Sequence, residues 1–532
     1  MLEILNKKRN FSIPILIFTF FFLIYISSSG AHPDPYDGVS FFLIGENLAL
    51  NGTPTMNINT PSADELGFNV GEYVRIKASL ESWPQWKIHA PEMRYGDYRD
   101  IYLKSVNPES YFSNAYVVLP FLIAPLYLVA TALNFSPITF VSLLFNPIIM
   151  SITCVVIFLF GKKLYNSEKI GFTLSLIFGV TSFIWPYITT LFANIIGILF
   201  LVSSIYLIIR EKTNPTIFNS FFAGLFIGFS FLSNLQFATV FPAVAIFGLI
   251  KFRKNKKSLV LFIIAISITL LIQAELNMIR TGSPFEIGYM EFDQPGLIEE
   301  NNFFPLVQGI YGFLLSPGNS IFLYFPIAIL YPIGLYYLSK YDKSLAILFI
   351  VITLVIYLLI ATEPTWNKNP YWGAHRYLLP IIPLITLSVG SLIVKFSNFR
   401  RWRWGIVLLS VGGFFVNLLG NLVWVQYAFS YGWGPEGIWK IEDKSSVFTW
   451  NPFHSPIVQS IKVLLSNWTS TIVNPVDGYM KIGLYGCNYD VFFYCKFGIF
   501  PIILLGVGIS IVGYILLKIL TTTDKKHLKS NL

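Results

Sequence analysis

Charged residues are scarce in this sequence. Asp, Glu, Lys and Arg make up 12% of the 532 residues, whereas soluble domains carry about 25%. Hydrophobic residues make up 54% and aromatic residues 17%. A soluble fold of this length could not bury so much apolar surface, so the deficit of charge indicates a polytopic membrane protein.

Motifs of several soluble enzyme classes are absent. The chain contains no GxxxxGK[ST] loop, no Rossmann glycine pattern and no G-x-S-x-G elbow, so ATP-driven transport and serine hydrolysis lack support. There are three cysteines, with no CxxC and no Cys/His zinc spacing. Cys487 and Cys495 lie close together in a late polar segment. If that segment lies outside the cytoplasm, the two can form a disulfide.

The positive charges gather between apolar runs. The formal net charge is +9, but the Lys and Arg residues form short clusters and no basic face with readout geometry, which argues against nucleic-acid binding. Such clusters are the positive-inside pattern of a membrane protein and also favour anionic lipid heads. They lie at 7–9, 162–163, 251–257, 399–404 and 524–529.

Long apolar runs predict the fold class. A membrane span needs about 20 apolar residues, and about thirteen runs approach that length. We predict an all-α polytopic membrane protein with a bundle of about 12–13 transmembrane helices. The first run could be a signal peptide, but without a clear small-residue cleavage site it favours an uncleaved span. The runs lie near 11–29, 115–134, 138–160, 170–186, 190–210, 217–234, 236–250, 258–277, 321–339, 344–361, 376–395, 405–427 and 498–519.

The basic clusters also predict which polar stretches lie outside the cytoplasm. These stretches are 30–114, 278–320, 362–375 and 428–497. The counts from the two ends of the chain disagree in parity around 115–210, so either one segment there dips in without crossing or the C-terminal tail lies outside.

The same pattern divides the chain into three regions. A transmembrane region covers 1–427 and includes a first extracytoplasmic loop at 30–114. An extracytoplasmic loop follows at 428–497, and a last helix with a basic tail occupies 498–532.

Two aspartates follow the first apolar run, Asp34 and Asp37. Counting from Asp37, Phe41, Gly45 and Leu48 fall on one face of a helix, which predicts an amphipathic helix beginning at that acid. Asp37 can serve as the cap of this helix, or it can hold a carboxylate at the membrane boundary for chemistry. The spacing leaves both interpretations open.

This first loop resembles that of the GT-C membrane glycosyltransferases. The resemblance is to the branch that contains the protein O-mannosyltransferases, the lipid A aminoarabinose transferase and the RgtA/B/C/D-like proteins. Three later stretches resemble segments of these proteins in the same order: "YGFLLSPGNSIFLYFP" at 311–326, "YWGAHRYLLPIIPLI" at 371–385 and "GNLVWVQYAFSYGW" at 420–433. The Trp-Trp-Asp-Tyr-Gly pattern of oligosaccharyltransferases is absent, which argues against transfer of a preassembled glycan.

The resemblance implies a transfer reaction at the outer face of the cell membrane. A monosaccharide would move from a polyprenyl-phosphate donor to an acceptor protein, lipid or glycan. Asp37, with Asp34 as a second acid, would be the catalytic base for the acceptor hydroxyl. Arg376, His375 and Lys368 would bind the donor phosphate.

Further residues of the predicted outer segments are weaker candidates. Glu363, Arg280 and His89 could contact donor or acceptor. Use of a divalent metal stays open, with His32, Asp34 and Asp37 as ligands if any, but His32 is also explained as an ordinary interfacial histidine.

Other function classes fit parts of the sequence. A transporter or flippase of lipid-linked sugars shares the basic loops and the many spans, but it should show repeat symmetry between its halves, which we do not see. A polysaccharide polymerase or ligase would differ mainly in the size of the acceptor.

Overall fold

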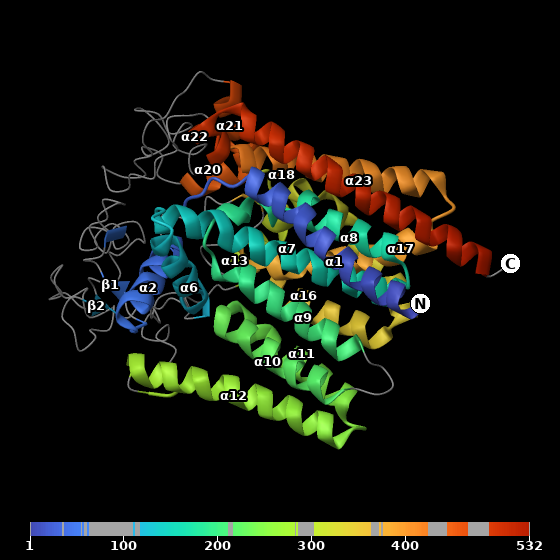
Figure 1. Cartoon of the computed structure of the whole chain (residues 1–532), viewed down its shortest axis with the longest axis horizontal. Coiled ribbons are helices and arrows are strands. Elements are labelled where there is room, and N and C mark those ends of the chain that lie inside the picture. Colours follow the sequence, from blue (N-terminus) through green and yellow to red (C-terminus); the bar gives the residue numbers. More distant parts are fainter. Residues whose placement is uncertain are drawn as a thin grey trace.

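The computed structural model is a bundle of helices with both chain ends at one end of the molecule (Figure 1). Apart from the short strands β1 (Met56–Asn57) and β2 (Ser110–Tyr111), which pair antiparallel, the regular secondary structure of the described residues is helical. The structure describes residues 2–33, 37–54, 56–57, 61–62, 110–111, 118–210, 216–281, 283–285, 303–362, 372–373, 376–423, 444–465 and 489–530.

Seven helical segments within these ranges are long and apolar enough to cross a membrane. They are α7 (Pro137–Tyr165), α9 (Ala193–Arg210), α12 (Lys256–Thr281), α16 (Lys343–Ala361), η5 (Arg376–Ile381) with α17 (Ile382–Lys395), α18 (Arg400–Leu422) and α23 (Ile499–Ser530). The predicted class of α-helical membrane protein is confirmed at this level, because every one of them overlaps a predicted span.

The remaining helices complete the described chain. Those of the bundle are α1 (Leu2–Ser27), α8 (Glu168–Thr181), η2 (Trp185–Thr189), α10 (Ile217–Ser233), α11 (Gln236–Phe252), α13 (Phe303–Leu315), α14 (Ile321–Tyr324), η4 (Pro326–Leu330) and α15 (Tyr331–Tyr341). Those near the polar stretches are α2 (Asp37–Asn51), α6 (Val118–Ala132), α20 (Lys444–Trp450), η7 (Pro452–His454), α21 (Pro456–Leu465) and α22 (Phe492–Phe497).

Polar side chains set several of the helix starts. The hydroxyls of Ser136, Ser167 and Thr216 accept hydrogen bonds from backbone N–H groups in the first turns of α7, α8 and α10. The Asp342 carboxylate does the same for α16. Such caps satisfy amides that have no partner within the helix, and they place the helix boundaries in otherwise apolar sequence.

The outermost helices expose apolar side chains. Leu271 of α12 is 69% exposed and Leu504 of α23 is 56% exposed, and α23 lies along the outside of the bundle (Figure 1). In contrast, α9 and α17 are mostly buried among other helices. A surface of this kind suits contact with lipid, because lipid chains are as apolar as leucine.

One end of the bundle carries most of the short helices. Figure 1 shows α2, α6, β1, β2, α20, α21 and α22 at the end opposite to the two chain ends. We call this the loop end, and the end with both chain ends the basic end. The backbone of Asp37 belongs to the loop end, because α2 begins there.

Helices α2 and α6 pack against each other at the loop end. A Cβ atom at Gly45 would overlap the side chain of Ile123, and the ring centroids of Phe42 and Tyr127 lie 6.2 Å apart, so the helices run antiparallel. The sequence predicts one buried face for α2, but every residue from 38 to 47 is buried. The prediction of an amphipathic helix is therefore wrong, because α6 and the start of α9 cover the other faces.

Candidate functional site

The first candidate is the segment that links α1 to α2. The backbone of Asp37 is the first residue of α2, as the sequence predicts. Asp34 and the side chain of Asp37 lie outside the described residues. Residues 28–33 just before them are all buried, so the two acids follow a segment that is fixed by packing.

A buried ion pair holds this segment. His32 Nε2 lies 2.7 Å from Asp490 Oδ1, and the two side chains are 7% and 2% exposed. A Cβ atom at Gly30 would overlap the Asp490 carboxylate, so only glycine fits beside the pair. Removing either side chain would leave its buried partner without this hydrogen bond, which is costly in a medium of low dielectric.

Backbone bonds continue the same contact. The amide of Phe492 donates to the carbonyl of Ser29 at 2.9 Å, and the amide of Asp490 donates to the carbonyl of Leu422 at 2.8 Å. Trp185 Nε1 donates to Ser28 Oγ at 3.1 Å. The end of α1 is thus tied to the end of α18 and to the segment before α22.

This geometry corrects the interpretation of His32. The sequence offers an interfacial histidine or a metal ligand with Asp34 and Asp37, but the side chain is buried in an ion pair. Its other ring nitrogen, Nδ1, lies 3.3 Å from the carbonyl oxygen of Pro33. Both ring nitrogens face protein oxygens. Asp34 and the side chain of Asp37 lie outside the described residues, so the metal site stays a prediction. No group of three metal-ligand side chains occurs among the described residues.

A second contact links α2 to Arg376. Leu191 and Ala193 pack in the same apolar cluster as residues 39 and 41–44 of α2. Phe192, between them, faces the other way: its ring centroid lies 4.6 Å from Cζ of Arg376. The segment 191–193 therefore joins the apolar cluster that includes α2 to the aromatic contact of the Arg376 guanidinium.

Buried polar bonds fix that linking segment. The side-chain amide of Asn146 donates to the carbonyls of Tyr187 and Thr190, and Asn146 is fully buried. The Tyr187 and Phe192 ring centroids are 6.0 Å apart. The position of Phe192 under Arg376 is thus set by η2 and α7.

Arg376 is half-buried between aromatic rings. It begins η5, and besides Phe192 its guanidinium lies 5.3 Å from the ring centroid of Tyr377. Stacking on aromatic faces leaves the guanidinium edge able to hold a phosphate by parallel hydrogen bonds. Among the three predicted phosphate ligands, Arg376 is the one whose side chain the structure describes; His375 and Lys368 lie outside it.

The stretch before Arg376 is anchored in the core. Trp372 is buried, and its Nε1 donates to Asn417 Oδ1 at 3.2 Å. The Asn417 amide donates in turn to the carbonyls of Thr181 and Tyr324 at 3.1 and 2.8 Å. Tyr324 packs edge-on against Trp372, with centroids 5.4 Å apart. A Cβ atom at Gly420 would overlap the Trp372 ring.

These contacts bring together stretches that the sequence analysis singles out. Tyr324 belongs to 311–326, Trp372 to 371–385 and Gly420 to 420–433. The turn in the first of them also binds α20: the amide of Gly318 donates to the carbonyl of Thr449 at 3.1 Å, and the rings of Tyr311 and Trp450 stack at 5.3 Å.

Several predicted residues are not placed. Glu363, His89 and Cys487 lie outside the described residues, and the side chain of Arg280 in α12 does as well. Cys495 is disulfide-bonded, whereas Cys154 is a buried free thiol. His454 of η7 is described: partial burial and the nearby Lys462 lower the pKa of its imidazole below the ordinary value of 6.5.

Other buried polar residues give no signal in the sequence. Glu46 of α2 is fully buried, and its Oε1 accepts a hydrogen bond from the Tyr127 hydroxyl at 3.0 Å. Asp490 pairs with a histidine 458 residues away. Neither acid belongs to a local pattern, and only their burial distinguishes them from surface carboxylates.

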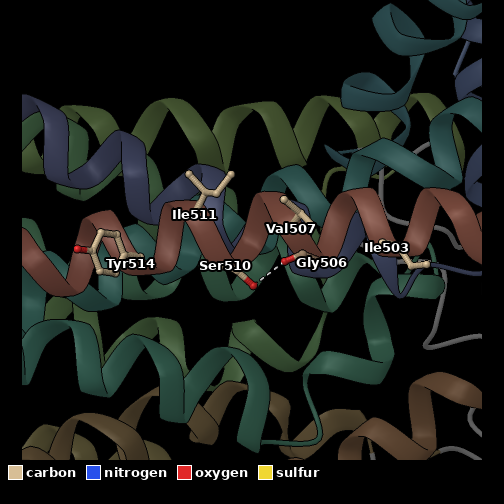
Figure 2. Close-up of a pocket in the computed structure, with 6 residues that line it drawn as sticks. All are labelled: Ile503, Gly506, Val507, Ser510, Ile511 and Tyr514. Atoms are coloured by element: carbon tan, nitrogen blue, oxygen red, sulfur yellow. Dashed lines mark hydrogen bonds between the residues drawn. The ribbon is translucent and has the colours of Figure 1, made fainter.

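An open groove on α23 lies away from these residues. Figure 2 shows its six lining residues along one face of that helix, with the Ser510 hydroxyl donating to the carbonyl of Gly506 at 2.8 Å. The lining is otherwise apolar, apart from the hydroxyl of Tyr514, so it suits lipid contact better than chemistry. The residues are Ile503, Gly506, Val507, Ser510, Ile511 and Tyr514.

Comparisons with known proteins add no assignment. The chain matches no protein-family model, and no curated protein matches it significantly.

Proposed function

We propose that this chain is an integral-membrane glycosyltransferase that moves a monosaccharide from a polyprenyl-phosphate donor to an acceptor on the extracytoplasmic face of the cell membrane. The observation that carries the proposal is the segment 191–193. Leu191 and Ala193 belong to the same apolar cluster as the helix that starts at Asp37, and Phe192 between them contacts Arg376. A general base and a phosphate-binding cation are the two groups that such a transfer needs.

The last turns of the helices support the orientation. Helices α7, α9, α11, α15 and α17 each carry Lys or Arg in the last turn, and α8, α10, α16 and α18 carry none there. Successive helices joined by short connections run in opposite directions, so the first group ends at the basic end. The positive-inside rule then puts the basic end in the cytoplasm and the loop end outside.

The same arrangement supports one answer to the parity of the spans. We infer that α6 does not cross, because it packs on α2 and is followed within a few residues by α7. Among the described helices, twelve would then cross, and both chain ends would lie in the cytoplasm. They are α1, α7, α8, α9, α10, α11, α12, α15, α16, α17, α18 and α23.

In the proposed reaction, Asp37 and Arg376 have separate roles. The acceptor hydroxyl attacks the anomeric carbon of the sugar, and the carboxylate of Asp37 takes its proton. The bond from that carbon to the lipid phosphate breaks, and Arg376 stabilises the charge on the released phosphate. His32 holds the start of this loop through Asp490 and takes no part in the transfer.

The alternative function is transport of lipid-linked sugars. A transporter or flippase of lipid-linked sugars would place its polar groups near the membrane midplane between symmetry-related halves. In the described chain, the ion pair of His32 and the cluster around Arg376 lie near the loop end instead. That position favours a transferase, whereas the distinction from a polysaccharide polymerase or ligase rests on the size of the acceptor.

A transfer assay tests the proposal. Purified full-length protein in nanodiscs is incubated with acceptor membranes and a panel of radiolabelled sugars linked to polyprenyl phosphate. We expect label from at least one donor to enter an acceptor. The labelled product should be stable to mild acid. If donors instead exchange across the bilayer without forming a new glycosidic bond, the protein is a flippase.

A further inference from the structure

Two buried carboxamides carry polar atoms that have no hydrogen-bond partner among the described residues. Gln236 is 6% exposed, and neither its Nε2 nor its Oε1 has a partner among the described residues. Asn194 is 2% exposed, and its Nδ2 has none. A buried amide without a partner loses its hydrogen bonds to water and gains nothing in return.

The two amides occupy adjacent helix starts. Gln236 is the first residue of α11 and Asn194 the second of α9, and these helices pack together. A Cβ atom at Gly197 would overlap the ring of Phe237. Since Gly197 shares a helix face with Asn194 and Phe237 follows Gln236, the two carboxamides belong to one interface.

That interface adjoins the phosphate-binding candidate. Phe192, which contacts the Arg376 guanidinium at 4.6 Å, lies two residues before Asn194. Helix α9 also packs directly against η5, which begins at Arg376. A ligand with its phosphate on Arg376 would therefore carry its next chemical group toward the amides.

The chemistry of the amides indicates what that group is. A carboxamide offers two donors and an acceptor in one plane, and it has no charge. It therefore pairs well with vicinal hydroxyl groups, which both donate and accept, and poorly with a second phosphate, which only accepts. We propose that Gln236 and Asn194 form the subsite for the hydroxyls of the donor sugar. This proposal rests on the proposed transferase function.

Binding measurements can separate this subsite from the phosphate site. Full-length protein in nanodiscs is titrated with polyprenyl phosphate, and separately with polyprenyl phosphate esters of mannose, glucose and arabinose. We expect the parent protein to prefer at least one ester over the bare phosphate. Gln236→Met should reduce that preference by about tenfold, as for loss of one or two hydrogen bonds, and leave binding of the bare phosphate unchanged.

A matched amide provides the control. Asn277 of α12 is equally buried, but its Nδ2 donates to the carbonyl of Pro284 at 3.0 Å and its Oδ1 accepts from Gln273 at 2.6 Å. Asn277→Leu should lower the melting temperature and keep the sugar preference. Gln236→Met and Asn194→Leu, made separately, should keep or raise the melting temperature, because each removes a polar group that has no partner.

The outcomes are distinct. Sugar preference retained in both Gln236→Met and Asn194→Leu overturns the subsite. The subsite is also overturned if Gln236→Met and Asn194→Leu lower the melting temperature as Asn277→Leu does and keep the sugar preference. The amides would then be hydrogen-bonded to buried water. If neither the bare phosphate nor any ester binds the parent protein, the proposed function itself fails.

Discussion

Removing the carboxylate of Asp490 tests how the first loop is held. The Asp490→Ala variant takes away the group that His32 Nε2 contacts at 2.7 Å, while the backbone bond from Asp490 to Leu422 can persist. The two side chains are 7% and 2% exposed, so solvent screens the pair little. Loss of one partner of a buried ion pair costs about 3–5 kcal/mol, and we expect about 3 kcal/mol here.

A second ion pair of the same chain gives the control. Lys162 Nζ lies 2.9 Å from Glu168 Oε1, but the lysine side chain is 34% exposed. The distance resembles that of the His32 pair, so the difference between the pairs is mainly burial. Exposed pairs contribute about 0–1 kcal/mol, and we expect Glu168→Ala to cost no more than about 1 kcal/mol.

The assay is a double-mutant cycle on unfolding. Asp490→Ala, His32→Ala and the double variant are unfolded in mixed micelles, with tryptophan fluorescence and circular dichroism as signals. The loss in the double variant should be smaller than the sum of the single losses by about 2 kcal/mol. Single losses that add within about 0.3 kcal/mol, or an Asp490→Ala loss no larger than that of Glu168→Ala, would refute the ion-pair account.

Four further predictions follow from described contacts. Arg376→Lys should lower transfer on the order of tenfold in a radiolabel assay, because a lysine cannot hold phosphate with a planar fork. Tyr127→Phe should destabilise the protein by about 1–3 kcal/mol in chemical unfolding, because Glu46 loses its donor. Asn417→Leu should lower the melting temperature more than any single loop-end variant, since the carbonyls of Thr181 and Tyr324 lose a donor and the Trp372 indole loses its acceptor. His454 has a pKa below 6.5, so the unfolded chain binds that proton more readily; stability should fall as the pH drops from about 6.5, and His454→Gln should reduce this slope.

The sequence predicts the bundle well because its signals are local. Apolar runs of span length and basic clusters mark the helices and their ends, and the start of α2 at Asp37 follows from one capping residue and a helical spacing. The span at 115–134 could not be assigned in this way. Helix α6 there is as apolar as a span, and our inference that it does not cross rests on its packing against α2.

The candidate site is harder to predict because its contacts join distant residues. The pair of His32 and Asp490 spans 458 residues, and Asn417 contacts Thr181 at a separation of 236 residues. Neither Asp490 nor Asn417 has a neighbour in sequence that marks it. Their roles follow from burial and from partners that only the fold brings within hydrogen-bond distance.

The most direct measurement compares two aspartates that each lie at a helix start. Asp37 begins α2, and Asp342 caps α16, where its carboxylate accepts from the amide of Leu345 at 3.1 Å. We expect Asp37→Asn to fold normally and to lower transfer from a lipid-linked sugar by on the order of 10²-fold or more, as for loss of a positioned base. Asp342→Asn should also fold normally, because Asn caps a helix as well as Asp, and it should keep transfer per folded molecule. Near-normal transfer by Asp37→Asn would contradict the central claim, because Asp37 would then be a helix cap and no more.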